Sequence, residues 1–311
     1  MIRNKQSMNK IRLKAPASSA NVGPGYDIFA MAMQEPYDEI EIELNDSNKI
    51  SIAVVNDTQN IPTDVNDNTA GLAALALLDR FNIKQGIHIR IIKKMKSGGG
   101  MGTTGASAAG CIFGLNELLG LKLSDNEMID LARMGEVASG GSPHADNVSA
   151  ALLGGFILVK SYNPIDVLKL DLPDFPIALA AIRKSQRTTR GFITYEIGQE
   201  KLKEQMARCS RVIHAIHTKD IEEFGKAVSV DYIAEPVRSA AIPEYNFVKE
   251  NVLKAGAYGF NVSGGGSSVF AICNKNNIDE IAAIMEKAFA ENPHFVKVYK
   301  TKTSNKGVEK I

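Results

Sequence analysis

A glycine-rich run in the first third of the chain has the residue types of a phosphate-binding loop. It reads Ser97-Gly98-Gly99-Gly100-Met101-Gly102-Thr103-Thr104-Gly105-Ala106-Ser107. A strand-like run, 87–92, precedes it, and the small and apolar residues 106–119 are typical of a buried helix. Glycine lets the backbone approach a phosphate closely, and the N-terminus of a helix adds a partial positive charge. The run therefore predicts a nucleotide-binding site between Ser97 and Ser107.

The spacing within this loop narrows the kind of phosphate compound. No lysine follows a glycine here, so the P-loop pattern is absent. The spacing Gly100-x-Gly102-x-x-Gly105 matches the dinucleotide fingerprint, but that fold needs a second strand that ends in an acidic residue about 20 residues later. Residues 116–120 are helix-like instead. The loop therefore favours a nucleoside triphosphate, and its two threonine hydroxyls could reach a phosphate or Mg²⁺. A dehydrogenase that binds a dinucleotide is the alternative.

Four more polar stretches carry residue types that suit a small-molecule site. Residues 15–27 combine small residues, an asparagine, a Gly-Pro-Gly turn and a terminal aspartate. Residues 139–147 bring a histidine, an aspartate and an asparagine within four positions. Residues 183–190 hold four cations, and residues 263–268 form a second glycine loop, which by itself predicts a hairpin turn.

Hydrophobic periodicity indicates the strands and helices that must position these loops. We expect strands at 39–43, 50–55, 87–92, 177–182 and 269–273. We expect helices at 28–33, 68–81, 106–119, 124–138, 201–218, 221–228 and 278–290. The capping box Ser124-x-x-Glu127 marks the start of one of them, and residues 235–238 are expected to end a helical stretch.

Length, charge and cysteine content limit the class of protein. A chain of 311 residues can form two domains with a substantial core, and a shift in composition near residue 162 predicts domains at 1–165 and 166–311. A net charge of +1 gives no electrostatic reason to expect a nucleic acid or a membrane as partner. The basic residues 1–14 lack the apolar segment of a signal peptide, and no stretch is long enough to span a bilayer. Three scattered cysteines fit a reducing compartment, so we expect a cytoplasmic protein.

Three of these loops, in this order and spacing, resemble the three motifs of the GHMP kinases, the family of galactokinase, homoserine kinase, mevalonate kinase and phosphomevalonate kinase. Pro16 to Asp27 resembles the first motif, Gly98 to Gly110 the second, and Val262 to Val269 the third. The resemblance covers nearly the whole chain. It implies an α+β, two-domain GHMP kinase fold, with a ribosomal protein S5 domain 2-like N-terminal domain and a ferredoxin-like C-terminal domain.

Within the family, the likeness is greatest to the homoserine kinases. Its marks are Glu35-Pro36-Tyr37-Asp38, Gly135-Glu136, His144-Ala145-Asp146-Asn147 and Glu235-Pro236-Val237-Arg238. The resemblance implies phosphorylation of L-homoserine to O-phospho-L-homoserine, with ATP and Mg²⁺ as cofactors. A homodimer is a further expectation at the level of the family.

The resemblance also implies roles for individual residues. Glu136 and a hydroxyl of Thr103 or Thr104, with Thr104 preferred, would hold Mg²⁺, as a hard cation requires. The acceptor's carboxylate would bind Arg190 and Arg238, and its ammonium would bind Asp27. The residues implied to bind the acceptor are Asn21, Asp27, His144, Asn147, Arg190 and Arg238, and those implied to act in catalysis are Asn147, Glu136 and Arg190.

Several alternatives stay open at this point. The family's second motif carries serines where Thr103 and Thr104 stand, and the third carries a proline where Ser267 stands. The segment around Arg190 is shorter than in the family, so Arg187 could replace it. Asp146 matches the catalytic aspartate of mevalonate kinases, and the sequence does not decide whether it or its neighbour Asn147 faces the hydroxyl. Another acceptor, such as mevalonate or a sugar, and a catalytically silent ligand-sensing member are the competing functions.

Overall fold

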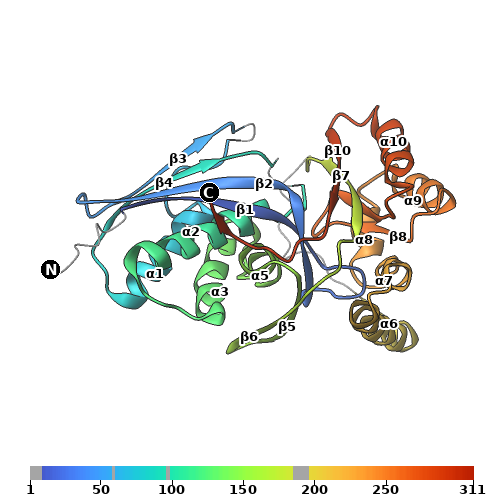
Figure 1. Ribbon diagram of the computed structural model, residues 1–311, viewed down its shortest axis with the longest axis horizontal. Helices are drawn as coiled ribbons and strands as arrows, with labels where there is room; N and C mark the ends of the chain where they lie inside the picture. Colours follow the sequence, from blue (N-terminus) through green and yellow to red (C-terminus); the bar gives the residue numbers. More distant parts are fainter. Residues whose placement is uncertain (1–8, 58–59, 96–98, 185–195) are drawn as a thin grey trace.

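A seven-stranded sheet forms the N-terminal domain of the computed structural model, which describes residues 9–57, 60–95, 99–184 and 196–311. Its strands are β1 (Lys10–Ala20), β2 (Phe29–Asn45), β3 (Ile50–Val55), β4 (Gly86–Ile92), β5 (Phe156–Tyr162), β6 (Ile165–Leu170) and β11 (Glu309–Lys310). Their order is β11-β1-β2-β4-β3, and the first residues of β2 also pair with β5, which pairs with β6. The long strand β2 therefore reaches from the sheet centre to the junction of the domains (Figure 1).

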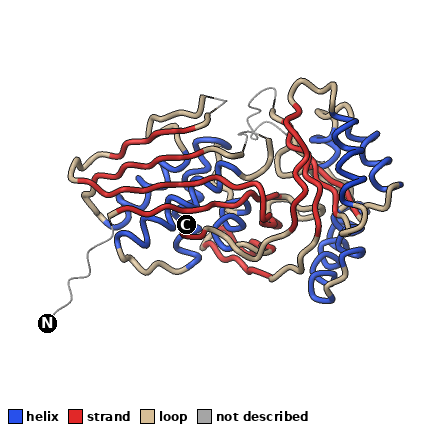
Figure 2. Tube along the Cα trace, turned by 45° about the horizontal axis from the view of Figure 1, so that its top comes forward, coloured by secondary structure: helices blue, strands red, loops and turns tan. Residues whose placement is uncertain are grey.

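Helices cover one face of this sheet (Figure 1). They are α1 (Thr69–Phe81), α2 (Thr103–Leu119), α3 (Asp125–Arg133), the 3₁₀ turn η1 (Met134–Glu136), α4 (Val137–Gly140) and α5 (Asp146–Leu153). Helix α2 packs directly on β1 and β2. A Cβ on Gly114 would stand 2.5 Å from Ile42 Cδ1, so glycine is what lets α2 lie this close to the sheet. Figure 2 shows the strands running side by side across these helices.

The C-terminal domain is a four-stranded antiparallel sheet with helices packed against it. Its strands are β7 (Pro176–Ile182), β8 (Gly259–Val262), β9 (Val269–Ile272) and β10 (Phe295–Lys302), in the order β10-β7-β9-β8. Its helices are α6 (Gln199–Thr218), α7 (Ile221–Val228), α8 (Glu235–Ser239), α9 (Tyr245–Lys254) and α10 (Ile278–Phe289). The order of β7, helices, β8, β9, α10 and β10 along the chain is the ferredoxin-like arrangement predicted from the sequence.

Two predicted elements are wrong, and most of the other predicted strands and helices are confirmed to within a few residues. The helix predicted at 124–138 is divided into α3, η1 and α4, and the strand predicted at 39–43 is part of the longer strand β2. Residues 28–33, expected to be a helix, contain the start of strand β2. Phe29–Met31 pair with β5 on one side, and Ala30–Ala32 pair with β1 on the other. A strand enclosed in this way is a continuous apolar run, which periodicity alone does not distinguish from a buried helix. Residues 235–238, expected to end a helical stretch, instead form most of the separate helix α8.

The chain crosses between the two domains more than once. Strand β6 belongs to the first sheet, and β11, near the C-terminus, returns to pair with β1. The predicted division after residue 165 falls within β6, after its first residue, and a division after Leu170 would keep the pairing of β5 and β6 within one domain. Met33 of β2 also forms a bridge with Thr303. No helix in the described ranges combines the length and apolarity that crossing a membrane requires.

Candidate active site

The three loops that the sequence singles out meet at the junction of the two domains. The N–H of Ser18, in the first loop, donates to the Met101 carbonyl of the second loop at 3.1 Å. Ser263 Oγ, in the third loop, donates to the Gly100 carbonyl at 2.8 Å. Backbone groups that lie far apart in the sequence therefore hold each other in one cluster.

Gly102 lies at the centre of this cluster. It is the N-cap of α2 and has φ +65°, a conformation that favours glycine. A Cβ at this position would stand 2.0 Å from Ser18 Oγ and 2.9 Å from Asn147 Oδ1. Ser18 Oγ also donates to Asn147 Oδ1 at 2.9 Å. The first loop, the glycine loop and the start of α5 thus approach one another so closely that only a hydrogen fits at residue 102.

The N-terminus of α2 has the features of an anion site. No side chain caps it, and its first turn holds no acidic residue. Its first N–H groups and its partial positive charge are therefore not offset by a side chain of the helix itself. Further along, Gly105 lets α2 pack against Asn147, and Ser107 Oγ donates to the Thr103 carbonyl at 3.1 Å. A nucleotide-binding role for these two residues, as for the rest of the glycine loop, stays a prediction.

The buried carboxylate of Asp38, on β2, holds the glycine loop at both of the loop's ends. Asp38 Oδ1 accepts hydrogen bonds from the N–H groups of Lys94, at 2.7 Å, and Met95, at 2.8 Å. Its Oδ2 accepts from Thr103 Oγ1 at 2.8 Å and from the ammonium of Lys93, which also contacts that hydroxyl. A buried ion pair needs such additional hydrogen bonds. The Thr103 hydroxyl is therefore already bonded within this cluster. Of the two threonines, Thr104 remains the candidate for a metal ligand.

Thr69 lies between the two segments that carry the predicted magnesium ligands. Thr69 Oγ1 donates to the Thr104 carbonyl at 3.3 Å, and a Cβ on Gly135 would stand 2.2 Å from the Thr69 carbonyl oxygen. Glu136 is only 5% exposed, and within the described ranges no hydrogen bond occupies Thr104 Oγ1. A carboxylate and a hydroxyl are ligands that fit Mg²⁺. The described residues contain no group of three or more His, Cys, Asp or Glu that would form a metal site by themselves.

Asn21, Asp27 and His144 lie together on the other side of the glycine loop. Asn21 Oδ1 accepts from the Asp27 N–H at 2.8 Å, and both residues have positive φ. His144 Nδ1 is 3.7 Å from Asp27 Oδ1. Asn21 Nδ2 is buried and has no hydrogen-bond partner among the described residues, so it is a donor that a ligand could use. Three predicted acceptor-binding residues thus line one place.

Tyr162 supports this group from β5, although the sequence did not identify it. Its hydroxyl donates to the Asp27 carbonyl at 2.7 Å. Burial raises the pKa of Tyr162, and the charges of Asp146 and Asp27 raise it further. The hydroxyl therefore stays protonated and remains a donor at neutral pH.

The neighbours Asp146 and Asn147 face different surroundings. Asp146 is completely buried, and its charge acts on Tyr162. Its Oδ1 accepts from the Asn147 N–H at 2.7 Å, and its Oδ2 has no hydrogen-bond partner within the ranges described. Asn147 contacts Ser18 beside Gly102. Of the two side chains that the sequence left open, that of Asn147 borders the glycine loop.

Arg238 reaches into the same cluster from the C-terminal domain. It lies on α8, is 9% exposed, and donates from Nη1 to the Gly264 carbonyl at 2.7 Å. Its guanidinium carbon lies 5.6 Å from the centre of the Tyr26 ring, within the range of a cation–π contact. Tyr26 is adjacent to Asp27, so the cation of the C-terminal domain reaches the loop that carries the Asp27 carboxylate.

The remaining predicted residues divide into two groups. The carbonyl of Gly99 accepts from the Ser268 N–H at 2.9 Å, which joins the second and third loops again. Ser97, Gly98, Arg187 and Arg190 lie outside the described residues. The choice between the two arginines for the acceptor's carboxylate therefore stays open.

Sequence reasoning missed three residues that the structure places around the cluster. They are Asp38, Tyr162 and Gln205, whose Nε2 donates to the Pro24 carbonyl of the first loop at 2.8 Å. Asp38 stood in a segment that carried the family resemblance, but nothing near it in the sequence indicated partners 55 to 65 positions away. Gln205 and Tyr162 gave no signal, because each lies within an ordinary helix or strand.

Family models match both domains. A model of the "GHMP kinases N terminal domain" matches residues 68–155, and a model of "GHMP kinases C terminal" matches residues 212–291. Together they cover more than half of the chain, and they confirm the predicted family.

Two proteins that are similar over nearly the full chain are homoserine kinases. One from Methanococcus maripaludis is 39% identical over 293 residues, which cover 94% of this chain and 97% of that protein. One from Methanococcus vannielii is 39% identical over 284 residues, which cover 91% of this chain and 94% of that protein.

A solved structure agrees with these relatives. The crystal structure of homoserine kinase from Cytophaga hutchinsonii matches with a TM-score of 0.90 and 33% sequence identity, over 98% of this chain and 99% of that chain. The predicted two-domain α+β architecture is confirmed by this match over nearly the full length of both chains. The meeting of three glycine-containing loops, the two matched domains and these near full-length relatives lead to one conclusion: this chain belongs to the GHMP kinase family.

Proposed function

We propose that this chain transfers the γ-phosphoryl group of ATP to the hydroxyl of L-homoserine, which yields O-phospho-L-homoserine. One observation carries the proposal: Asp27 and Arg238 lie around the first loop, and this loop is hydrogen-bonded to the glycine loop at the N-terminus of α2. A zwitterion could thus be held next to a phosphate. The names of the similar proteins support the same reaction.

The nucleotide half of the proposal rests on backbone positions. The β- and γ-phosphates would lie on the glycine loop and on the first turn of α2, where N–H groups and the helix dipole favour negative charge. The Asp38 carboxylate holds the loop from below through the N–H groups of Lys94 and Met95. Phosphoryl transfer depends mainly on positioning and on neutralising charge, so a loop held at both ends suits it.

Mg²⁺ would bind between Glu136 and Thr104. When bound, the ion would neutralise the charge of the phosphates and withdraw electrons from the group in transfer. Glu136 supplies a buried carboxylate at the end of η1, and Thr104 supplies a hydroxyl in the first turn of α2. Thr69 holds the two elements together.

The acceptor half rests on charge and hydrogen bonding. The ammonium of L-homoserine would pair with Asp27, which the Asn21 and Tyr162 side chains hold in place. Its carboxylate would pair with the planar guanidinium of Arg238. Asn147 would orient the hydroxyl towards the γ-phosphate beside Gly102. No side chain is assigned as a dedicated general base.

The charges also bear on the competing acceptors. Mevalonate has a carboxylate but no ammonium, and a neutral sugar has neither. The pair formed by Asp27 and Arg238 therefore favours an amino acid. A catalytically silent protein would not need a buried carboxylate such as that of Glu136.

A panel of acceptors tests the proposal. The chain is incubated with ATP and Mg²⁺ and with L-homoserine, mevalonate or galactose, and ADP release is measured, with Glu136→Gln as the matched control of lowered activity. We expect the highest kcat/KM with L-homoserine. A higher kcat/KM with mevalonate or galactose would overturn the assignment of L-homoserine as the acceptor. No ADP release with any of the three compounds would favour the ligand-sensing alternative.

Two further expectations belong with this proposal. We propose a homodimer, on the likeness to the family alone. We also propose a cytoplasmic location, which the three free cysteines support because none of them is paired in a disulfide.

A further inference from the structure

A glutamine on helix α6 connects the acceptor loop to the rest of the C-terminal domain. Gln205 is 3% exposed, and its amide makes three hydrogen bonds. Nε2 donates to the Pro24 carbonyl and to Asp231 Oδ1, both at 2.8 Å, and Oε1 accepts from the Tyr232 N–H at 2.9 Å. One helical turn later, the weak donor Cys209 Sγ lies 3.4 Å from the same Pro24 carbonyl. This side of α6 therefore docks on the loop that carries Asn21 and Asp27.

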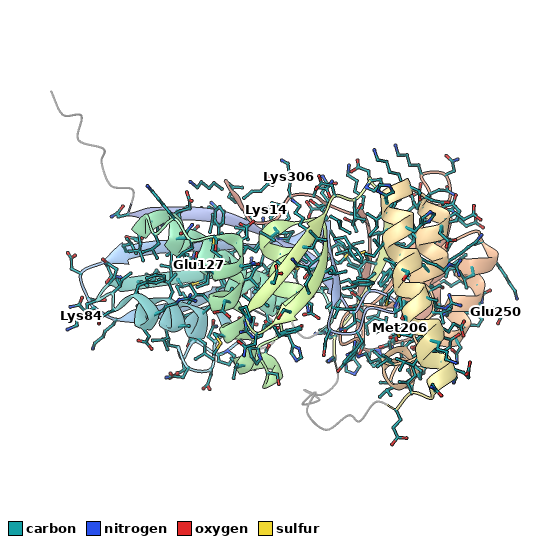
Figure 3. All side chains as sticks on the ribbon, turned by 90° about the horizontal axis from the view of Figure 1, so that it is seen from below. Lys14, Lys84, Glu127, Met206, Glu250 and Lys306 are labelled. Carbon is teal, nitrogen blue, oxygen red and sulfur yellow. The ribbon has the colours of Figure 1, made fainter. Side chains whose placement is uncertain are left out.

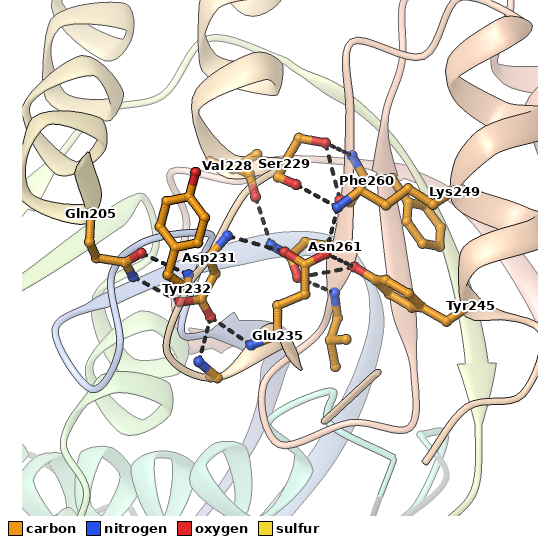
Figure 4. Close-up of polar contacts among 12 residues, drawn as sticks. Gln205, Val228, Ser229, Asp231, Tyr232, Glu235, Tyr245, Lys249, Phe260 and Asn261 are labelled. Carbon is orange, nitrogen blue, oxygen red and sulfur yellow. Dashed lines mark hydrogen bonds and ion pairs between the residues drawn. The ribbon is translucent and has the colours of Figure 1, made fainter. Parts of the chain in front are cut away.

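The partner of Gln205, Asp231, organises the start of helix α8. Its Oδ1 also accepts from the Ile233 N–H at 2.8 Å. Its Oδ2 accepts from the N–H groups of Ala234, at 3.0 Å, and Glu235, at 2.9 Å. Figure 4 shows this carboxylate among the backbone groups of the turn that leads into α8. The position of α8 thus depends on a carboxylate that Gln205 holds.

The opposite side of α8 is braced as well. Glu235 Oε1 accepts from the Tyr245 hydroxyl at 2.7 Å and from the Lys249 ammonium at 2.5 Å, and both of these side chains come from α9 (Figure 4). Glu235 Oε2 accepts from the Asp231 N–H at 3.1 Å. Helix α8 is therefore held from two directions, and its direction is set before any ligand binds.

These contacts close into a ring around the acceptor site. From Pro24 the ring passes through Gln205 and Asp231 to α8, and Arg238 of α8 donates to the Gly264 carbonyl. The Gly264 N–H donates to the Ala20 carbonyl at 3.1 Å, which returns to the first loop. Arg238 is a member of this ring, and Asp27 follows Pro24 by three residues and bonds to Asn21, which lies on the loop segment of the ring. The Gln205 amide is the link that joins the first loop to Asp231 across the domains.

We propose that Gln205 is a positioning residue for the acceptor, because it sets the spacing between the Asp27 carboxylate and the Arg238 guanidinium. The inference rests on the proposed function, in which these two groups bind the ammonium and the carboxylate of one molecule. Gln205 itself touches neither ATP nor the acceptor. Its effect falls on acceptors that carry both charges at a fixed separation, since only these need both groups in register.

The test is Gln205→Leu, which keeps most of the volume and removes the amide. KM is measured for ATP and for three acceptors: L-homoserine, 3-aminopropan-1-ol, which lacks the carboxylate, and 4-hydroxybutyrate, which lacks the ammonium. We expect KM for L-homoserine to rise about tenfold or more, a loss of about 1.4 kcal/mol, because its ammonium and its carboxylate would no longer meet both partners at once. KM for ATP should stay within about twofold, and the two analogues should lose about threefold at most.

Two variants separate positioning from stability. Val212→Ala opens a cavity on the same helix, where Val212 is fully buried, and it leaves the contacts to Pro24 and Asp231 in place. It should lower the melting temperature without changing the KM for ATP or for any of the three acceptors. Met206→Ala changes the neighbouring residue, which is 64% exposed and labelled in Figure 3. It should change neither the melting temperature nor any KM. Where Gln205→Leu does not fold, Gln205→Asn keeps the amide, shortens its reach and serves for the same measurements.

The outcomes are distinct. A rise in KM that is confined to L-homoserine supports the proposal. An unchanged KM for L-homoserine, or equal losses with all three acceptors and ATP, overturns it and makes Gln205 a residue of stability only. If the unaltered protein phosphorylates none of the three acceptors, the proposed function fails and the positioning role falls with it.

Discussion

Removing the Arg238 side chain is the most direct test of the proposed acceptor site. Arg238 is 9% exposed, contacts the Gly264 carbonyl at 2.7 Å, and lies 5.6 Å from the Tyr26 ring centre. Arg238→Ala would remove the proposed partner of the acceptor's carboxylate. It would also remove one hydrogen bond within the protein, so the experiment must distinguish a weaker site from a weaker fold.

The size of the effect follows from these contacts. Removal of one partner from a largely desolvated charge pair costs about 2–5 kcal/mol. At about 1.4 kcal/mol for each factor of ten, kcat/KM for L-homoserine should fall about 30- to 4,000-fold. The unsatisfied Gly264 carbonyl should lower the free energy of unfolding by about 1–3 kcal/mol. Arg238→Lys should recover only part of the activity, because an ammonium does not reproduce the planar pair of donors.

The assay compares acceptors that differ by one charge. L-homoserine and 4-hydroxybutyrate carry the carboxylate, and 3-aminopropan-1-ol does not. Arg238→Ala should lose most of its kcat/KM on the first two and little on the third, and the Kd for ATP should stay near that of the unaltered protein. Asp27→Asn is the matched control, since it should lose mainly on the two acceptors that carry an ammonium.

Equal losses on acceptors with and without a carboxylate would refute the reasoning. In that case Arg238 would act on the transferring phosphate or on the fold through Gly264. Urea unfolding of the same samples separates these two explanations, because only the second predicts that lost activity follows lost stability.

Four shorter predictions follow from other parts of the structure. Glu136→Gln should lower kcat about tenfold or more and raise the Mg²⁺ concentration that gives half-maximal activity; an unchanged Mg²⁺ titration would place Glu136 outside the metal site. Gly102→Ala should lower the free energy of unfolding by about 2–4 kcal/mol, because residue 102 has a φ of +65° and a Cβ there would stand 2.0 Å from Ser18 Oγ. The variant should also bind ATP more weakly in calorimetry, and unchanged stability would contradict this account. Asp38→Asn should cost about 3–5 kcal/mol in urea unfolding, because it leaves the buried Lys93 ammonium without its counter-charge, and a loss below about 1 kcal/mol would argue against that ion pair. The hydrogen bond from Lys94 holds the pKa of Glu39 below its usual value. Glu39 therefore stabilises the fold fully above about pH 4.5 and loses this effect as the pH falls through its lowered pKa. Glu39→Gln should lower the free energy of unfolding by up to about 1 kcal/mol at pH 7 and by less at pH 3, and equal losses at both pH values would refute this account.

The glycine-rich elements of the site could be predicted from sequence because their constraints are local. Gly102 needs a positive φ, and it precedes a helix of small residues, so the chain around it indicates the loop directly. The structure adds a second reason for this glycine that no local pattern contains: Ser18 and Asn147 approach its α-carbon from two other segments. A valine at this position would therefore displace both of these side chains as well as any phosphate.

The supporting residues could not be predicted, because their roles depend on tertiary contacts. Residues 29–33 form a strand since β1 and β5 flank them, whereas their apolar run also suits a helix. Gln205 is a polar position on a long helix and resembles a solvent-facing residue, yet it is buried because α6 docks on Pro24. Pattern identified the groups proposed to meet the ligands, while the groups that orient them emerged only from the packed structure.

Two buried carboxylates have equivalent tasks in the two halves of the site. Asp38 accepts from the N–H groups of Lys94 and Met95 below the nucleotide loop, and Asp231 accepts from three successive N–H groups at the start of α8. Each is satisfied by groups of the protein alone, so neither has to lose a partner when a ligand binds. In a reaction that depends on positioning, such ligand-independent supports keep the binding groups in place beforehand and lower the reorganisation required at the transition state. The charges proposed to meet the ligands, those of Asp27, Glu136 and Arg238, thus rest on elements that these two carboxylates hold before any ligand arrives.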